Sequence, residues 1–198
     1  MATTTGSDAF ARLVARANPE MVIVTAKTGD DANGCLVGFS TQCSIDPVHF
    51  LVCLSKANRT YEIACRSDAL AVHVLHDTED DRRLASLFGE HTERDPDDVH
   101  KLQRCRWRVG PWGLPVLDGH DWFAGEIVVR HDVGDHEAFV VAVTAGGTPV
   151  GGSRRLGFQA VRHGPRQSRL TSRLPPVAGA TAGDTVRDRA TCAPWQNR

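Results

Sequence analysis

The sequence predicts a single mainly β domain, a β-barrel that carries a few short helices. β-prone runs rich in Val, Ile, Leu and Phe follow one another at hairpin spacing along most of the chain. The helical segments between them are short, which favours a barrel over a doubly wound α/β sheet. No Gly-x-Gly-x-x-Gly motif follows a strand, so the sequence does not indicate a Rossmann dinucleotide site.

The chain opens with a predicted helix over residues 7–17, which Ser7 or Asp8 would cap. Its apolar side chains lie at helical spacing and form one stripe: Phe10, Leu13, Val14 and Ala17. Residues 1–18 are therefore expected to hold an N-terminal helix, ahead of a barrel domain over residues 19–163. The first strands of that domain are predicted at residues 21–26 and 35–39. Asn33-Gly34 between them is a strong hairpin-turn signal.

The next predicted elements are a strand over residues 48–54, a helix over 60–66, a strand over 69–75 and an amphipathic helix over 79–88. Residues 107–117 contain Trp, Gly and Pro and are expected to be irregular. Two long runs, residues 122–131 and 136–144, should form a second hairpin around a turn at 132–135. Residues 158–162 are expected to add a last short strand.

Composition limits the function classes. The 198 residues carry a net charge of −1 and 41% hydrophobic residues, which favours neither a nucleic-acid binder nor a disordered protein. From Ser153 onward the sequence contains nine arginines and two aspartates, and residues 164–198 lack apolar periodicity. This segment is expected to be a disordered, solvated tail and not a nucleic-acid binding arm.

Cysteine and histidine patterns suggest neither a metal site nor a disulfide framework. The six cysteines include no Cys-x-x-Cys pair, as expected for buried thiols in a reducing cytoplasm. The histidines lack a His-Glu-x-x-His spacing. No apolar run reaches the length of a membrane span, and the N-terminus does not resemble a signal peptide. We expect a cytoplasmic protein without membrane contact.

Two clusters of small polar residues follow the predicted strands at 35–39 and 48–54. The first holds Ser40, Thr41, Gln42, Cys43 and Ser44; the second holds Ser55, Lys56, Asn58, Arg59 and Thr60. The second cluster also starts a predicted helix, whose unpaired N–H groups and partial positive charge suit an anion. Simple helix capping by Ser55 or Asn58 is the alternative interpretation of that cluster.

The order of several motifs resembles the flavin reductase-like family, whose domain is an FMN-binding split barrel. These motifs are G-F-S-T-Q-C-S-I-D-P, then L-S-K-A-N-R-T, A-L-A-V-H-V-L and finally G-D-H-E-A-F, within residues 19–161. The resemblance implies an NAD(P)H-dependent flavin reductase that passes a hydride to FMN, or to FAD, with NADH or NADPH as donor. It also implies a homodimer and a partner monooxygenase that receives the reduced flavin.

The resemblance also implies roles for individual residues. The flavin ring would lie beside Val37, Gly38, Phe39, Ser40 and Thr41, with Cys43 and Ser44 close to the ring or ribityl chain. The phosphate motif K-x-S-x-T matches Lys56 to Thr60, next to Ser55, except that Asn58 replaces the serine. His136 of the G-D-H motif would position the nicotinamide, as the catalytic residue. A half-exposed strand histidine with no such role is the alternative for His136.

Two other functions remain open at this stage. The departures from the family pattern at Asn58, Val48 and His73 are compatible with a flavin-binding carrier or accessory protein that has no reductase turnover. A barrel that binds haem is a weaker alternative, with His73 and His136 as its candidate ligands.

Overall fold

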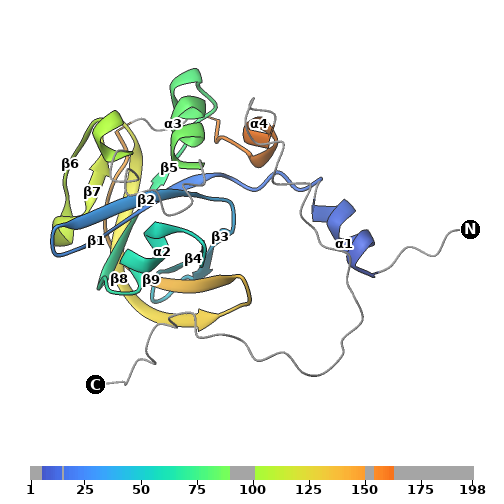
Figure 1. Ribbon diagram of the computed structural model, residues 1–198, viewed down its shortest axis with the longest axis horizontal. Helices are drawn as coiled ribbons and strands as arrows, with labels where there is room; N and C mark the ends of the chain where they lie inside the picture. The colour runs from blue at the N-terminus through green and yellow to red at the C-terminus, as the bar shows by residue number, and fades with distance from the viewer. Residues whose placement is uncertain (1–5, 15, 90–100, 150–153, 163–198) are drawn as a thin grey trace, which may run out of the picture.

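The computed structural model describes residues 6–14, 16–89, 101–149 and 154–162. Its body is a seven-stranded antiparallel sheet in the order β2-β1-β5-β8-β9-β4-β3, strongly curved around one core (Figure 1). The predicted mainly β fold is confirmed. The strands are β1 (Val22–Thr28), β2 (Asp31–Val37), β3 (Ser40–Ser44), β4 (His49–Ser55), β5 (Ala69–Val74), β8 (Asp121–Asp132) and β9 (His136–Gly147).

The first hairpin turns earlier than the sequence predicts. Thr28 pairs with Asp31, so the turn consists of Gly29 and Asp30, with Gly29 at φ +56°. The predicted turn at Asn33-Gly34 is wrong, because both residues lie inside β2. A Cβ on Gly34 would lie 2.8 Å from the Phe88 ring. Glycine is therefore needed here for helix packing against the strand and not for a turn.

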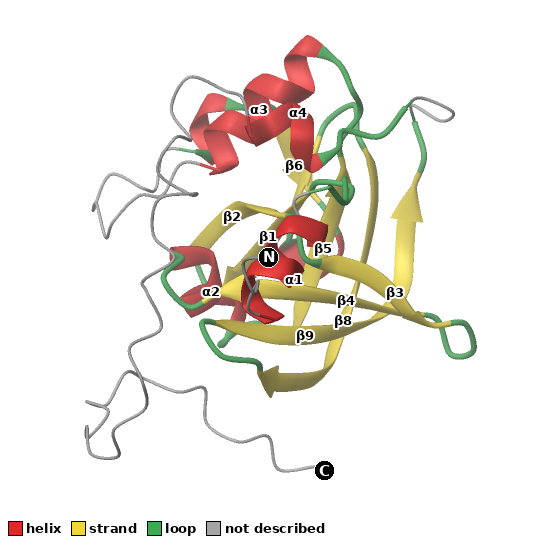
Figure 2. Cartoon of the chain, turned by 90° about the vertical axis from the view of Figure 1, so that its right-hand side faces the viewer, coloured by secondary structure: helices red, strands yellow, loops and turns green. Residues whose placement is uncertain are grey.

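One core fills the curve of the sheet, where the short helix α2 (Arg59–Ala64) packs against β1, β2 and β4. Its fully buried members come from strands far apart in sequence and include Val24, Leu54, Val72 and Phe139. A second core lies under α3 (Glu79–Gly89) and α4 (Phe158–Arg162), which sit together at one end of the sheet (Figure 2). α2 and α3 confirm the helices predicted near these positions.

The last element is a helix, α4, and the predicted strand over residues 158–162 is wrong. Phe158 and Val161 both contribute to the second core, and their spacing of three residues places them on one face of a helix. The strand-like hydrogen bonds are made by Leu156, two residues before this helix. Leu156 donates its N–H to the Leu75 carbonyl at 2.9 Å and accepts from the Met21 N–H at 2.8 Å.

Residues 107–117 also differ from the prediction of irregular chain. They form a small hairpin of β6 (Trp107–Val109) and β7 (Pro115–Leu117), joined through a 3-10 turn at Pro111–Gly113. The hairpin covers the outer face of β5, where Leu114 packs with Ala69 and Ala71. The Pro115 carbonyl accepts a hydrogen bond from the Thr25 hydroxyl at 2.7 Å, which ties the hairpin to β1.

The N-terminal helix α1 spans Gly6–Val14, shorter than the predicted residues 7–17. It projects away from the sheet (Figure 1), and Phe10 and Leu13 are 67% and 66% exposed. A further 3-10 turn, η2, covers Leu102–Arg104. None of the helices in the described ranges is long and apolar enough to cross a membrane. The expectation of a disordered tail over residues 164–198 falls outside the described residues.

Candidate functional site

Phe39 and His136 meet at one end of the sheet. Their ring centroids are 5.3 Å apart, with the planes at 62°, an edge-to-face contact. Phe39 lies between β2 and β3 and is 59% exposed, while its carbonyl accepts a hydrogen bond from the Cys53 N–H at 2.9 Å. His136 opens β9 opposite Ser55, the last residue of β4. The fold thus brings three of the predicted site residues together at the surface.

The neighbouring carboxylate of Asp135 selects one form of the His136 ring. Nδ1 of His136 lies 2.7 Å from Oδ1 of Asp135. Because an ionised carboxylate only accepts hydrogen bonds, Nδ1 carries the hydrogen and donates it. In the neutral ring, Nε2 therefore keeps a free lone pair that can accept a hydrogen bond from a ligand. The side chain of His136 is 22% exposed, so the ring is within reach of a small molecule.

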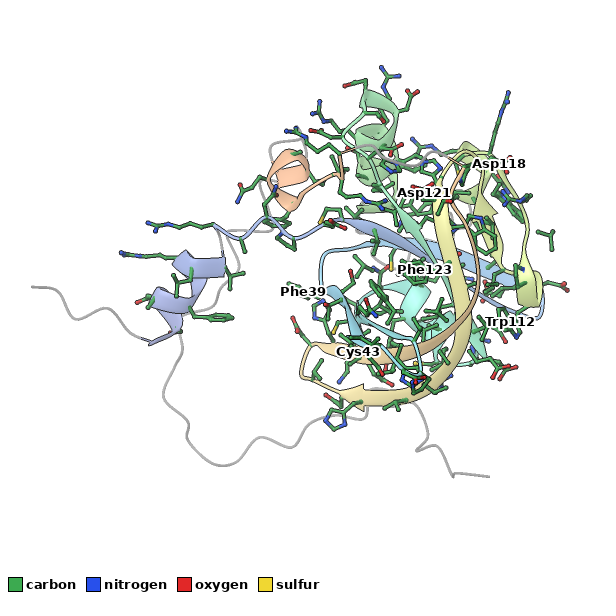
Figure 3. All side chains as sticks on the ribbon, turned by 180° about the vertical axis from the view of Figure 1, so that it is seen from behind. Phe39, Cys43, Trp112, Asp118, Asp121 and Phe123 are labelled. Atoms are coloured by element: carbon green, nitrogen blue, oxygen red, sulfur yellow. The ribbon has the colours of Figure 1, made fainter. Side chains whose placement is uncertain are left out.

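Residues 40–44 form the edge strand of the sheet, whereas the sequence interpretation placed them beyond the end of a strand. β3 pairs with β4 alone within the described sheet, so alternate N–H and C=O groups on its other side have no strand partner. Thr41, Gln42 and Cys43 are exposed, and a bulge separates Gln42 from Ser44. Figure 3 places Phe39 and Cys43 on the same side of the molecule, away from Trp112. A planar heterocycle could hydrogen-bond to this free edge.

The strand predicted to run through residues 35–39 stops at Val37, and Gly38 lies in the bend that follows. A Cβ on Gly38 would lie 3.3 Å from the sulfur of Met21. This contact gives a packing reason for glycine at the position. The contact of Val37 and Gly38 with a flavin ring stays a prediction.

The predicted phosphate-binding residues lie around the start of α2. Thr60 is fully buried, and its hydroxyl has no hydrogen-bond partner among the described residues. Both cations of the cluster are engaged: Lys56 pairs with Asp132 at 2.5 Å and Arg59 with Asp31 at 2.9 Å. Asn58 precedes α2, but its side chain makes no capping hydrogen bond.

Arg59 is directed away from the other predicted residues. Its partner Asp31 begins β2, whereas Val37 ends that strand. Six strand residues span about 20 Å, so the Arg59 guanidinium and Val37 lie at opposite ends of β2. The structure brings Ser55 and Lys56 close to His136, and it does not bring Arg59 to the Phe39 end of the site.

These observations fit a flavin nucleotide. A flavin ring needs backbone donors and acceptors along one edge and an accessible face, and the free side of β3 beside Phe39 and His136 supplies them. A phosphate needs hydrogen-bond donors, and the Thr60 hydroxyl, which has no partner among the described residues, is such a donor at the start of α2.

Several supporting residues carried no recognisable sequence signal. Tyr61 donates a hydrogen bond from its hydroxyl to Oε2 of Glu137 at 2.8 Å. Burial, and then this bond to Glu137, raise the pKa of Tyr61 to about 12. Arg130 donates to the carbonyls of Cys65 and Ser67 at 2.5 and 2.7 Å. Together these contacts attach α2 and the turn after it to β8 and β9.

His73 is a core residue. It is fully buried in β5, with Nδ1 3.1 Å from the Ile23 carbonyl, and burial lowers its pKa to about 3. It pairs with Trp122, which in turn pairs with Gly147 at the far end of β9 from His136. His73 and His136 therefore cannot ligate one group, and the haem alternative loses its ligand pair.

Cys35, Cys43, Cys53 and Cys105 are free thiols. In the part of the chain that the structure describes, His, Cys, Asp and Glu side chains form no group of three or more that could hold a metal ion.

Fold, edge strand and motif order together define a flavin reductase-type barrel. Residues 15–163 match the model of the flavin reductase like domain, and the chain belongs to this family.

Among curated proteins, the chain is 28% identical over 146 residues to the NADH-dependent flavin reductase StyB of Pseudomonas fluorescens, covering 72% of this chain and 79% of StyB. It is 34% identical over 111 residues to HsaB of Rhodococcus jostii (strain RHA1), the reductase subunit of a flavin-dependent monooxygenase, covering 52% of each. The chain spans 38% of the length of a probable flavin reductase of Rhizobium meliloti (strain 1021), to which it is 32% identical over 127 residues, compared with 79% of StyB and 52% of HsaB.

A solved structure with the same fold is the NADH:FAD oxidoreductase SgcE6 of Streptomyces globisporus C-1027, in complex with NAD and FAD fragments. Its TM-score is 0.65 at 21% identity, covering 79% of this chain and 90% of that one. At this identity the likeness concerns the fold.

Proposed function

We propose that this protein is an NAD(P)H-dependent flavin reductase. In the reaction, a dihydronicotinamide gives a hydride to oxidised FMN, or FAD, and a proton from solvent completes the reduced flavin. The contact of Phe39 with His136 beside the free edge of β3 carries the proposal, because it combines hydrogen-bonding backbone, an exposed aromatic ring and a polar ring at one place.

In this proposal the backbone of residues 40–44 binds the polar edge of the flavin ring, with Phe39 beside it. Thr60, with Ser55 and Asn58 near it, forms the phosphate side, whereas the charges of Lys56 and Arg59 are paired with Asp132 and Asp31. His136 accepts a hydrogen bond at Nε2 from the carboxamide of the nicotinamide, which orients the hydride donor over the flavin. Hydride transfer depends chiefly on stacking geometry, so an orienting role is sufficient.

The relatives support a delivery role. HsaB is named as the reductase subunit of a flavin-dependent monooxygenase, and StyB as an NADH-dependent flavin reductase. We propose that the reduced flavin passes to a partner monooxygenase, and that the protein acts as a homodimer.

The test starts with purified protein mixed with FMN, and separately with FAD, followed by removal of the excess. NADH and then NADPH are added without oxygen. Retained flavin absorbance at about 450 nm that bleaches when one of the nicotinamides is added would support reductase activity and identify the hydride donor. If flavin is not retained, steady-state oxidation of NADH or NADPH with saturating flavin decides the matter. Turnover no faster than that of free flavin would overturn the proposal, and bound flavin that no nicotinamide bleaches would favour the carrier alternative.

A further inference from the structure

The turn that presents His136 is fixed by hydrogen bonds from two directions. Within the turn, Gly134 donates its N–H to Oδ1 of Asp132 at 2.9 Å, and Val133 donates to the His136 carbonyl at 3.1 Å. From the end of β4, Lys56 donates its backbone N–H to the Asp135 carbonyl at 3.0 Å and its ammonium to Oδ2 of Asp132 at 2.5 Å. Lys56 thus contacts the residues on both sides of Val133 and Gly134.

The conformation of this turn decides where the His136 ring points. Asp135 belongs to the turn, and its carboxylate holds Nδ1 of His136. Gly134 has φ +108°, a backbone conformation that glycine adopts easily and leaves easily. Contacts from outside the turn therefore add to its internal hydrogen bonds in keeping one conformation, and the two from Lys56 come from the residue that follows β4.

We infer that Lys56 is a positioning residue for His136, acting through the turn, and that its ammonium is not a ligand of the flavin phosphate. This inference rests on the proposed function for its consequence in the reaction, and on the Lys56–Asp132 contact for its geometry. The hydrogen bond from Lys56, followed by that from Gly134, lowers the pKa of Asp132, as expected for a carboxylate that keeps its charge to hold a cation. Loss of the pair would weaken nicotinamide binding and leave flavin binding unchanged.

Four variants test the inference. Lys56→Met and Asp132→Asn each remove the charge pair, and the double variant Lys56→Glu with Asp132→Lys restores it with reversed charges. Asp118→Asn is the matched control, because it breaks an exposed pair with Arg108 at 3.3 Å. Figure 3 shows Asp118 at the opposite side of the molecule from Phe39. Lys56 and Asp132 are 27% and 61% exposed, so the folded state should survive, which circular dichroism would verify.

The first readout needs no activity: the ring ¹⁵N chemical shifts of His136, which report its tautomer. Lys56→Met and Asp132→Asn should both move these shifts toward a mixture of tautomers. The charge-reversed pair should restore them in part, because Asp132→Lys also removes the acceptor of the Gly134 N–H. Unchanged His136 signals in both single variants would overturn the inference, whether or not the protein reduces flavin. Failure of the wild-type protein to oxidise NADH or NADPH would instead overturn the proposed function.

The second readout separates the two substrates. Each single variant should raise the KM for the nicotinamide about two- to fivefold, the range that an exposed ion pair supports, with the Kd for FMN within about twofold of wild type. The reversed pair should recover part of the loss, and Asp118→Asn should change neither constant. A phosphate ligand predicts another result: weaker FMN binding in Lys56→Met, no effect of Asp132→Asn, and no recovery in the reversed pair.

Discussion

The ring of Phe39 stands edge-on to the ring of His136, with 5.3 Å between their centroids, although the two residues are distant along the chain. β4 connects them, because its Cys53 N–H donates a hydrogen bond to the Phe39 carbonyl and its Ser55 pairs with His136. A small molecule bound at the Ser40 end of β3 would therefore lie close to both rings.

His136→Ala is expected to lower kcat/KM for the nicotinamide by about tenfold or more, since small losses of alignment are costly in hydride transfer. FMN affinity should stay close to that of wild type. Phe39→Ala should have the opposite effect: FMN affinity should fall more than kcat/KM for the nicotinamide. Steady-state kinetics and flavin titrations measure both. Equal effects of the two substitutions on both substrates would contradict the separate roles.

Tyr61→Phe removes the hydrogen bond that the buried carboxylate of Glu137 accepts. Leaving a buried polar group without such a bond costs about 1–3 kcal/mol, so the free energy of unfolding should fall by that amount. Urea denaturation followed by circular dichroism measures it. Glu137→Gln provides the comparison, because its amide oxygen can still accept a hydrogen bond from Tyr61. The free energy of unfolding should therefore fall less in this variant. A Tyr61→Phe protein as stable as wild type would show that this bond contributes little.

The pH dependence of stability should reflect a buried pair between α3 and the start of β8. His120 Nε2 lies 3.1 Å from Oδ1 of Asp81. Burial lowers the pKa of His120, but the hydrogen bond and the charge of Asp81 outweigh it, so the net pKa is raised above 6.5. Burial likewise raises the pKa of Asp81, but bonds from His120 and from the His76 N–H outweigh it and lower the pKa below 3.8.

The raised pKa of His120 gives stability that is fully present below pH 6.5 and is lost as the pH rises through the folded-state value. The lowered pKa of Asp81 gives stability that is present above pH 3.8 and is lost as the pH falls through its folded-state value. The pair should therefore contribute most to the free energy of unfolding between pH 3.8 and pH 6.5. Comparing Tm against pH for wild type and His120→Gln should show the difference between them shrinking on the alkaline side. A constant difference across the range would contradict this assignment.

Gly34→Ala should destabilise the protein by about 1–3 kcal/mol, the usual cost of overpacking. The new methyl group would lie 2.8 Å from Cε1 of Phe88 and 3.1 Å from Cγ2 of Thr25. Gly6→Ala is the control, because its Cβ would meet nothing within 4 Å. Urea unfolding of both variants provides the measurement, and equal stabilities would show that α3 shifts at no cost.

The sequence predicted the strands well where apolar runs were long and continuous. β5, β8 and β9 lie within two or three residues of their predicted positions, because burial in the sheet requires such runs. Short segments were harder. Phe158 to Arg162 is too short to show a helical or a strand period, and the packing of Phe158 and Val161 in the second core favours the helix. Asn33-Gly34 has the composition of a turn, yet glycine is needed at position 34 because the Phe88 ring of α3 leaves no room for a Cβ.

For the candidate site, the sequence located the segments, and the family resemblance located His136. It could not reveal that the charges of Lys56 and Arg59 are taken by Asp132 and Asp31, since these pairs depend on strand register. For the same reason the contacts of Glu137 with Tyr61 and of Arg130 with the carbonyls of Cys65 and Ser67 had no signal in the sequence.

The free edge of β3 has a further consequence for the protein in solution. Unpaired strand backbone that can receive a ligand can equally receive a strand from another molecule, which leads to aggregation. The edge is protected by its exposed polar side chains, Thr41 and Gln42, and by the bulge that interrupts regular pairing before Ser44. Keeping this strand polar and irregular therefore protects colloidal stability while leaving its backbone open.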